Sequence, residues 1–335
     1  MRVLIYLLMI ITATALSLGV GLVVGFELQD ASRWLLVATA ATTPFIVMGP
    51  AVIGAFAGYW DHRSSPESRR YLGWWFAAVI AVEVVAAVFI VLATLSARAP
   101  LWVPVVLVLG AAVLLAVARP LGALFRRTER PIPEDLGPSV PDGSVVRRKL
   151  VVIGVTFVIA AAVATIGAAL LTALGGGRVE ALTQTVLLAG QLTFTATAMA
   201  TLFVALPFSR ALRDAGGRDI GRLRRFAKVV LRGKDLPLDG TDARGAVRYA
   251  QILPLVLQFQ LGFTGLLYVA IVFQCLSYVV RGDLGLLPEV FLAAIVVVLA
   301  LVFPLTLRRI RRARRYVDRH VHAGDRGSGP DASAV

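Results

Sequence analysis

The sequence predicts an all-α, polytopic integral membrane bundle of eight transmembrane helices, and three observations support this fold class. First, 58% of the 335 residues are hydrophobic and only 16% are charged, more apolar side chain than one soluble core of this length holds. Second, long apolar runs recur along the whole chain, each able to cross a hydrocarbon layer of about 30 Å. Third, the segments between these runs alternate between rich and poor in basic residues.

Apolar runs of about 18 or more residues are typical of membrane-spanning helices, because a helix satisfies its backbone hydrogen bonds within one lipid-exposed segment. Eight such runs are present, at 3–25, 34–58, 72–95, 101–118, 150–174, 185–208, 252–280 and 286–307. The first run also resembles a cleavable secretory signal, with a basic start and small residues at Ala13 and Ala15. It continues in apolar residues to Gly25, however, which favours a retained span.

The distribution of Lys and Arg predicts the orientation in the membrane. Successive terminal and loop segments carry 1, 1, 3, 1, 7, 1, 11, 1 and 8 of them, so 30 of the 34 fall on one side. The positive-inside rule places that side, with both termini, in the cytoplasm. Topology and attraction to anionic lipid head groups then explain the net charge of +14 without a nucleic-acid partner. The preference for Arg over Lys, with abundant Ala, Val and Gly, indicates a GC-rich bacterial genome and hence a bacterial plasma membrane.

Composition divides the chain into successive regions. Residues 1–118 carry the first four predicted spans and residues 150–307 the last four, and a linker at 119–149 is rich in Pro, Gly and charge. A basic loop occupies 209–250, and the tail at 308–335 is first basic and then disordered in composition. Two pairs of prolines lie 184 residues apart, Pro104 with Pro288 and Pro120 with Pro304. They are compatible with two parallel four-helix halves and equally with ordinary helix punctuation.

One segment of the basic loop predicts an amphipathic helix. Apolar residues at 220, 223, 226, 227, 230 and 231 follow helical spacing, and Asp219 precedes them as a candidate N-cap. The candidate lipid- or partner-binding residues lie largely on the remaining surface: Arg222, Arg224, Arg225, Lys228 and Arg232. Such a helix can lie in the membrane interface or dock into a partner's groove, and we expect the interfacial position.

The same loop contains the pattern Asp-Gly-x-x-Ala-Arg at Asp239–Arg244, which resembles the core of the CDP-alcohol phosphotransferase signature. In that family several aspartates hold a divalent metal for phosphoryl transfer. Here position 236 is Leu236, and no acid follows Asp242 before Asp283, so the carboxylates that the resemblance implies are missing. The chain has one cysteine, Cys275, and no other catalytic, metal or cofactor motif. We therefore expect no catalytic residues, metal site or cofactor, and an enzyme is the least favoured function.

Glu83 lies in the middle of the third apolar run, roughly 17 Å from its cytoplasmic end. No Lys or Arg lies at that depth, so we expect a protonated carboxyl that donates to a threonine or to a carbonyl freed by proline. Intramembrane ionisable residues mark ion and substrate pathways, although a neutral packing role is the alternative. The candidate proton and solute path combines Glu83 with other polar or helix-interrupting residues: Thr43, Pro44, Thr197, Gln258, Gln260 and Thr264.

Two further patterns predict how the spans pack. Pro44 and Pro50 should kink or open the second span, because each removes a backbone donor. Small residues four apart predict close helix contacts and weak interhelical hydrogen bonds. They occur in three spans: Ser17, Gly21 and Gly25; Gly54 and Gly58; Thr193, Thr197 and Thr201.

These features support two classes of function. The first is a transporter or permease component for a small or lipid-like solute, proton-linked through Glu83. The alternative is a non-transporting membrane scaffold or subunit, which recruits a cytoplasmic partner or anionic lipid through its basic loop and tail.

Overall fold

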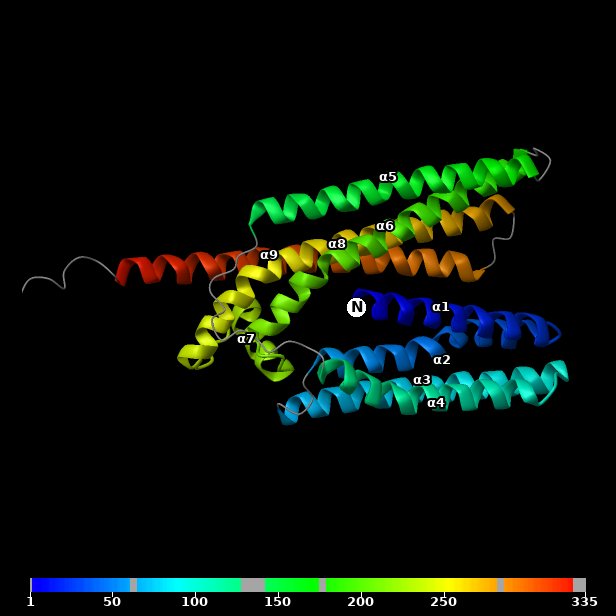
Figure 1. Cartoon of the computed structure of the whole chain (residues 1–335), viewed down its shortest axis with the longest axis horizontal. Coiled ribbons are helices and arrows are strands. Elements are labelled where there is room, and N and C mark those ends of the chain that lie inside the picture. The colour runs from blue at the N-terminus through cyan, green and yellow to red at the C-terminus, as the bar shows by residue number, and fades with distance from the viewer. Residues whose placement is uncertain (1, 61–64, 128–141, 175–178, 282–285, 328–335) are drawn as a thin grey trace, which may run out of the picture. The chain divides into compact units, whose positions relative to one another are not determined.

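The structure, a computed structural model, describes residues 2–60, 65–127, 142–174, 179–281 and 286–327, and the regular elements in these ranges are all helices (Figure 1). In chain order they are α1 (Arg2–Glu27), α2 (Arg33–Tyr59), α3 (Pro66–Ala97), α4 (Trp102–Arg127), α5 (Gly143–Leu174), α6 (Val179–Ala215), α7 (Ile220–Arg232), α8 (Gly240–Arg281) and α9 (Leu286–Gly327). The described part therefore has the predicted all-α class. Seven of these helices, α2–α6, α8 and α9, are long and apolar enough to cross a membrane.

The predicted first span falls within α1. Where its side chains are described, α1 contributes a shorter apolar stretch, Ala15–Glu27. An eighth span consequently stays a prediction. The other seven predicted spans coincide with α2–α6, α8 and α9. Part of the predicted linker, 128–141, and the end of the tail, 328–335, lie outside the described residues.

Several helices extend past their apolar runs at the end that carries the basic residues. α8 begins at Gly240, twelve residues before its apolar run, and α9 continues to Gly327, twenty residues beyond its own. The region predicted as a linker is partly helical, because α4 continues to Arg127 and α5 begins at Gly143. The extensions of α8 and α9 carry apolar residues that pack on one another, so helix formation continues outside the apolar span.

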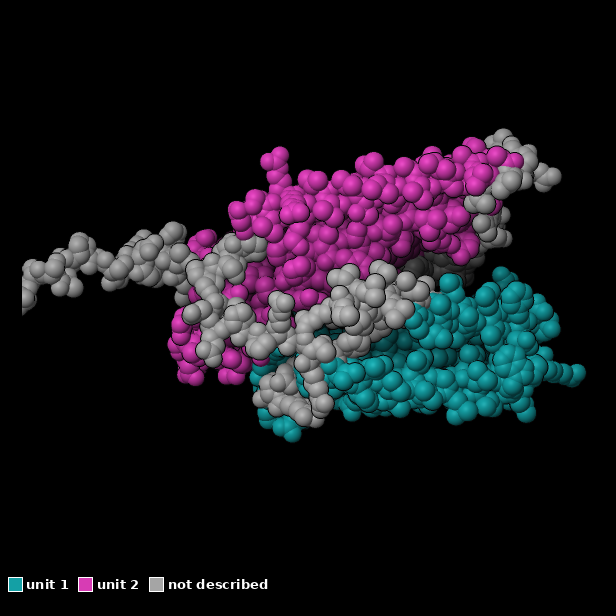
Figure 2. Space-filling model, viewed as in Figure 1, with its two compact units in different colours: residues 1–132, 218–221 teal, residues 133–217, 222–335 magenta. Residues whose placement is uncertain are grey.

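The chain clusters into two compact units (Figure 2). The first comprises Met1–Ile132 and Arg218–Gly221, with α1–α4 as its helices. Within this unit α2 packs most extensively, against α4, α3 and α1. Its core consists of branched and small side chains that are almost completely buried, among them Leu28, Ile46, Ile90 and Val103.

Within the first unit, α2 and α4 meet at glycines. A Cβ built on Gly122 of α4 would lie 2.4 Å from the carbonyl oxygen of Gly54 and 2.9 Å from the backbone nitrogen of Gly58. The small-residue pair at Gly54 and Gly58 thus forms a close helix contact, as predicted. Gly21 and Gly25 of α1 form no such contact with the described part of the chain, because none of its atoms lies within 4 Å of a Cβ built on either.

Tryptophan marks both ends of the first unit, which holds all five tryptophans of the chain. Trp34 and Trp102 are exposed at the starts of α2 and α4, whereas Trp60, Trp74 and Trp75 lie near the end of α2 and the start of α3. Trp34 and Trp60 are separated by roughly 39 Å along α2, close to the thickness of a bilayer with its head groups. Such girdles are typical of the two membrane–water interfaces.

The second unit comprises Pro133–Gly217 and Arg222–Val335, with α5, α6, α8, α9 and nearly all of α7. Its helices pack in the order α5, α6, α8, α9, and α6 with α8 is the most extensive pair. Between them Phe194 stacks on Phe273 at a centroid distance of 5.5 Å. Gly190 gives this ring its room, because a Cβ there would lie 2.6 Å from Phe273.

Candidate functional site

Glu83 is buried within the first unit, with only 8% of its surface exposed. It shares one face of α3 with Ala86 and Ile90, which follow three and seven residues later and are also buried. Its carboxyl group faces Gly49 of α2: a Cβ built on Gly49 would lie 3.4 Å from Glu83 Oε1 and 2.9 Å from Val79 Cγ1. The absence of a side chain at Gly49 therefore lets α3 approach α2 closely at this level, with Val79 and the carboxyl group packed against the glycine.

The Oε1 atom of Glu83 has no hydrogen-bond partner among the described residues. Thr43, an expected partner, instead donates its hydroxyl to the Thr39 carbonyl of its own helix at 2.7 Å. Thr39 supplies the polar link between α2 and α3, because its hydroxyl donates to the Phe89 carbonyl at 3.3 Å. A buried polar atom without a partner typically costs about 1–3 kcal/mol. Glu83 therefore carries an energetic cost that the apolar residues on the same face of α3 do not.

The two prolines of α2 do not open the helix, which continues through both of them. Pro44 is exposed, so it does not line the interior of the first unit, whereas Pro50 is buried beside Gly49. Because Pro50 has no N–H, the carbonyl of Ile46 loses its usual helical donor. Ile46 and Gly49 are three residues apart and thus on the same face of α2, the face that Glu83 approaches.

The remaining candidate path residues belong to the second unit, and they do not converge there. Gln258 and Gln260 are exposed on α8, where the interior positions are taken by the apolar Leu257 and Phe259. Thr264 is half-buried on the same helix. Gln258 and Gln260, which the predicted path placed in the interior, thus lie on the outer surface of this unit.

Three threonines of α6 are buried, but their hydroxyl groups donate within their own helix. Thr193, Thr197 and Thr201 each donate to the carbonyl four residues earlier, at 2.8, 2.8 and 2.9 Å. The predicted interhelical hydrogen bonds from these hydroxyls are therefore replaced by intrahelical ones. Their small side chains still permit close packing, since a Cβ on Gly262 of α8 would lie 3.8 Å from the Thr201 methyl group.

A second candidate site is α7, whose amphipathic pattern the sequence predicts correctly. Phe226 is fully buried and Val230 nearly so, in a cluster with residues of α8 and α9 such as Tyr249 and Ile310. This apolar face is not free to enter lipid, because the end of α6, the start of α8 and the extension of α9 already cover it, and the interfacial position of the helix stays a prediction. The exposed positions of α7 are all basic: Arg224, Arg225, Lys228 and Arg232.

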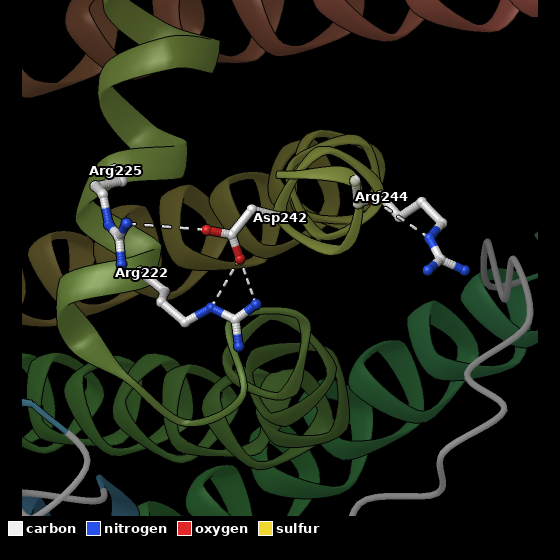
Figure 3. Close-up of polar contacts among 5 residues, drawn as sticks. Arg222, Arg225, Asp242 and Arg244 are labelled. Carbon is white, nitrogen blue, oxygen red and sulfur yellow. Dashed lines mark hydrogen bonds and ion pairs between the residues drawn. The ribbon is translucent and has the colours of Figure 1, made fainter. Parts of the chain in front are cut away.

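An ion pair at the start of α8 holds α7 in place (Figure 3). Asp242 Oδ1 accepts hydrogen bonds from both Nε, at 3.0 Å, and Nη2 of Arg222, and Arg225 Nη1 lies 3.9 Å from Asp242 Oδ2. The side chain of Asp242 is 11% exposed, and that of Arg222 is 35% exposed. Sequence reasoning used Asp242 only to reject a metal site and missed this role. One sequence feature could have indicated the ion pair: Asp242 is the one acidic residue between 240 and 281, and it lies in the first turn of a helix that follows a basic loop.

Both ends of α7 are capped. The N-cap predicted at Asp219 is present: its Oδ1 accepts a hydrogen bond from the Gly221 N–H at 2.7 Å. At the other end Gly233 adopts a positive φ of 64°, and its N–H donates to the Val229 carbonyl at 3.1 Å. Arg312 of α9 adds a hydrogen bond from Nη1 to the Leu231 carbonyl at 2.9 Å. The basic surface of α7 is thus carried by a helix that is fixed within the chain.

No protein-family model, no curated protein and no solved structure matches this chain.

Proposed function

We propose that the chain is an eight-span protein of the bacterial plasma membrane, with both termini in the cytoplasm, that works as a transporter or permease component. Its seven long apolar helices indicate a membrane-embedded protein. The one-sided distribution of Lys and Arg supports the orientation, and the tryptophans at both ends of the first unit support the span boundaries. The proposal also includes two parallel four-helix halves, for which the two pairs of matched prolines are the only support.

A single observation carries the transport function: Glu83 has a buried carboxyl oxygen that faces Gly49 of α2 and has no hydrogen-bond partner among the described residues. Ionisable residues inside membrane bundles are costly and mark ion and substrate pathways. In the proposed mechanism Glu83 takes up a proton from one side of the membrane and releases it to the other as a small or lipid-like solute moves. The Ile46 carbonyl, which lacks its usual helical donor, offers the protonated carboxyl group an acceptor on the same face of α2.

The test uses proteoliposomes that contain a pH-sensitive dye, with pools of amino acids, sugars, nucleosides and lipophilic cations added outside. We expect at least one pool to change the internal pH with wild-type protein and not with Glu83→Gln, which keeps the volume of the side chain. Glu67→Gln, an exposed carboxyl on the same helix, is the matched control and should behave as wild type. Equal responses from wild type and Glu83→Gln, at equal thermal stability, would rule out the proton-linked role.

A second candidate function, a membrane scaffold, is favoured by α7. Its exposed side chains are all basic, and its apolar face is committed to the protein core. Deleting α7 would uncover that core, so the sharper test replaces only the exposed Lys228 and Arg232 by glutamine. A scaffold predicts that a cytoplasmic partner purifies with the wild type and not with this variant. An unchanged set of purified proteins would count against it.

A further inference from the structure

The exposed surface of α9 changes from apolar to basic within one residue. Phe303, Leu305 and Leu307 are exposed and apolar, and the next six exposed residues, between 308 and 315, are all arginines. Exposed apolar side chains on a membrane span face hydrocarbon, and arginine at that depth is strongly disfavoured. The edge of the hydrocarbon layer therefore lies at Leu307 and Arg308.

The packing of α7 against α9 places it at the level of the lipid head groups. The two helices share a core that includes Ile310, Ala313, Tyr316 and Val317 of α9. At about 1.5 Å per residue, these positions lie roughly 3–14 Å beyond Arg308. The head-group region of one leaflet is roughly 5–8 Å thick. The exposed basic side chains of α7 are thus in reach of lipid phosphates, although its apolar face does not enter the membrane.

We propose that the exposed basic residues of α7 and the arginines of α9 between 308 and 315, together called the basic collar, bind the phosphate groups of anionic phospholipids. α7 contains no acidic residue, and neither does α9 between 308 and 317, so the collar is uniformly cationic. Guanidinium groups bind phosphate through paired N–H donors, which suits a collar composed mainly of arginine. This inference goes beyond the transport function and does not depend on it.

The collar is a preformed surface and not a flexible basic segment. Asp242 holds Arg222 on the inner side of α7, and Arg312 ties α9 to the α7 carbonyl of Leu231. These contacts leave Lys228, Arg232, Arg311 and Arg315 exposed on the two helices. A site fixed in this way binds a lipid without the entropy cost of ordering the backbone. It should therefore retain specific lipids through purification.

The test measures lipid binding by native mass spectrometry of the full chain in detergent, titrated with phosphatidylglycerol or with phosphatidylcholine of the same acyl chains. The collar variant carries Lys228→Gln, Arg232→Gln, Arg311→Gln and Arg315→Gln, which spares the ion pair of Asp242 and the contact of Arg312. The control variant removes the same charge from other exposed basic positions, with Arg69→Gln, Arg70→Gln, Arg147→Gln and Arg148→Gln. Both must melt at the wild-type temperature, and a collar variant that does not is replaced by its two pairs of substitutions, tested separately.

We expect wild type and control to bind phosphatidylglycerol more tightly than phosphatidylcholine, and the collar variant, which lacks four basic residues, to lose about a hundredfold to a thousandfold in affinity for phosphatidylglycerol. Each basic residue near an anionic surface is worth roughly fivefold in affinity. Equal binding of the two lipids by the wild type would overturn the proposal. So would equal losses in the collar and control variants. Unchanged lipid binding by the collar variant, with loss of an acidic protein that copurifies with the wild type, would replace the lipid by a protein partner.

Discussion

The contact between α2 and α4 offers a graded test of the first unit, based on replacing single glycines by alanine. The Cβ of Gly122→Ala would lie 2.4 Å from the Gly54 carbonyl oxygen, and ordinary contact begins at 3.4 Å, so the helices must separate by about 1 Å. The clashing atoms are two backbone atoms, of Gly54 and Gly58, and the Cβ of Ala57, and none of them can rotate away as the end of a long side chain can. Overpacking of this kind costs about 1–3 kcal/mol, and we expect Gly122→Ala at the upper end.

Gly110 lies on the same helix and provides the matched control. Within the residues that the structure describes, no neighbouring atom lies within 4 Å of its Cβ position, so Gly110→Ala should stabilise α4 by about 0.5–1 kcal/mol through helix propensity. Gly54→Ala, with its Cβ at 3.2 Å from the Ala118 carbonyl oxygen, should fall between the two. Thermal unfolding of the three variants in detergent checks this order. A Gly122→Ala protein that melts with or above Gly110→Ala would refute the close helix contact.

Three further substitutions test the second unit by the same unfolding assay. Asp242→Asn should destabilise the protein by about 1–2 kcal/mol, because it removes the charge of a largely buried carboxylate whose guanidinium partner, Arg222, is 35% exposed; a change near zero would show that the pair contributes nothing. Phe226→Ala should cost about 3–5 kcal/mol, whereas the exposed Lys228→Gln should cost almost nothing; equal effects would mean that α7 is not packed on its own chain. Gly190→Ala should cost about 1–3 kcal/mol by displacing the ring of Phe273, and the double variant with Phe273→Leu should recover part of that loss; no recovery would argue against the contact.

Apolar run length and helical periodicity were sufficient to predict the seven long apolar helices and the two faces of α7. The position of Asp219 as an N-cap also followed from local sequence, because capping involves neighbours in the chain. Periodicity shows which residues share a face, but not what that face contacts. The apolar face of α7 was therefore assigned to lipid, although the extension of α9 beyond its apolar run covers it.

The candidate site was predicted less completely, for related reasons. Glu83 follows from its isolation in an apolar run, and it is buried, but its neighbour Gly49 has no side chain and gave no signal in the sequence. Gln258 and Gln260 were assigned to an interior path from their depth alone, and depth does not specify the side of a helix. The hydroxyl of Thr197 donates to the Thr193 carbonyl of its own helix at 2.8 Å, an acceptor that every helical threonine has within reach whatever its neighbours are. The Asp242 pair joins α7 to α8 through tertiary packing that local patterns do not report.

The central claim is that Glu83 binds and releases a proton within the bundle. Infrared difference spectroscopy of the protein in liposomes measures this directly, through the C=O stretching band that only a protonated carboxylic acid shows. We predict a band that diminishes reversibly as the pH is raised, is retained in Glu67→Gln and is absent from Glu83→Gln. A band that is missing from the wild type, or that persists in Glu83→Gln, or that does not change with pH, would contradict the claim.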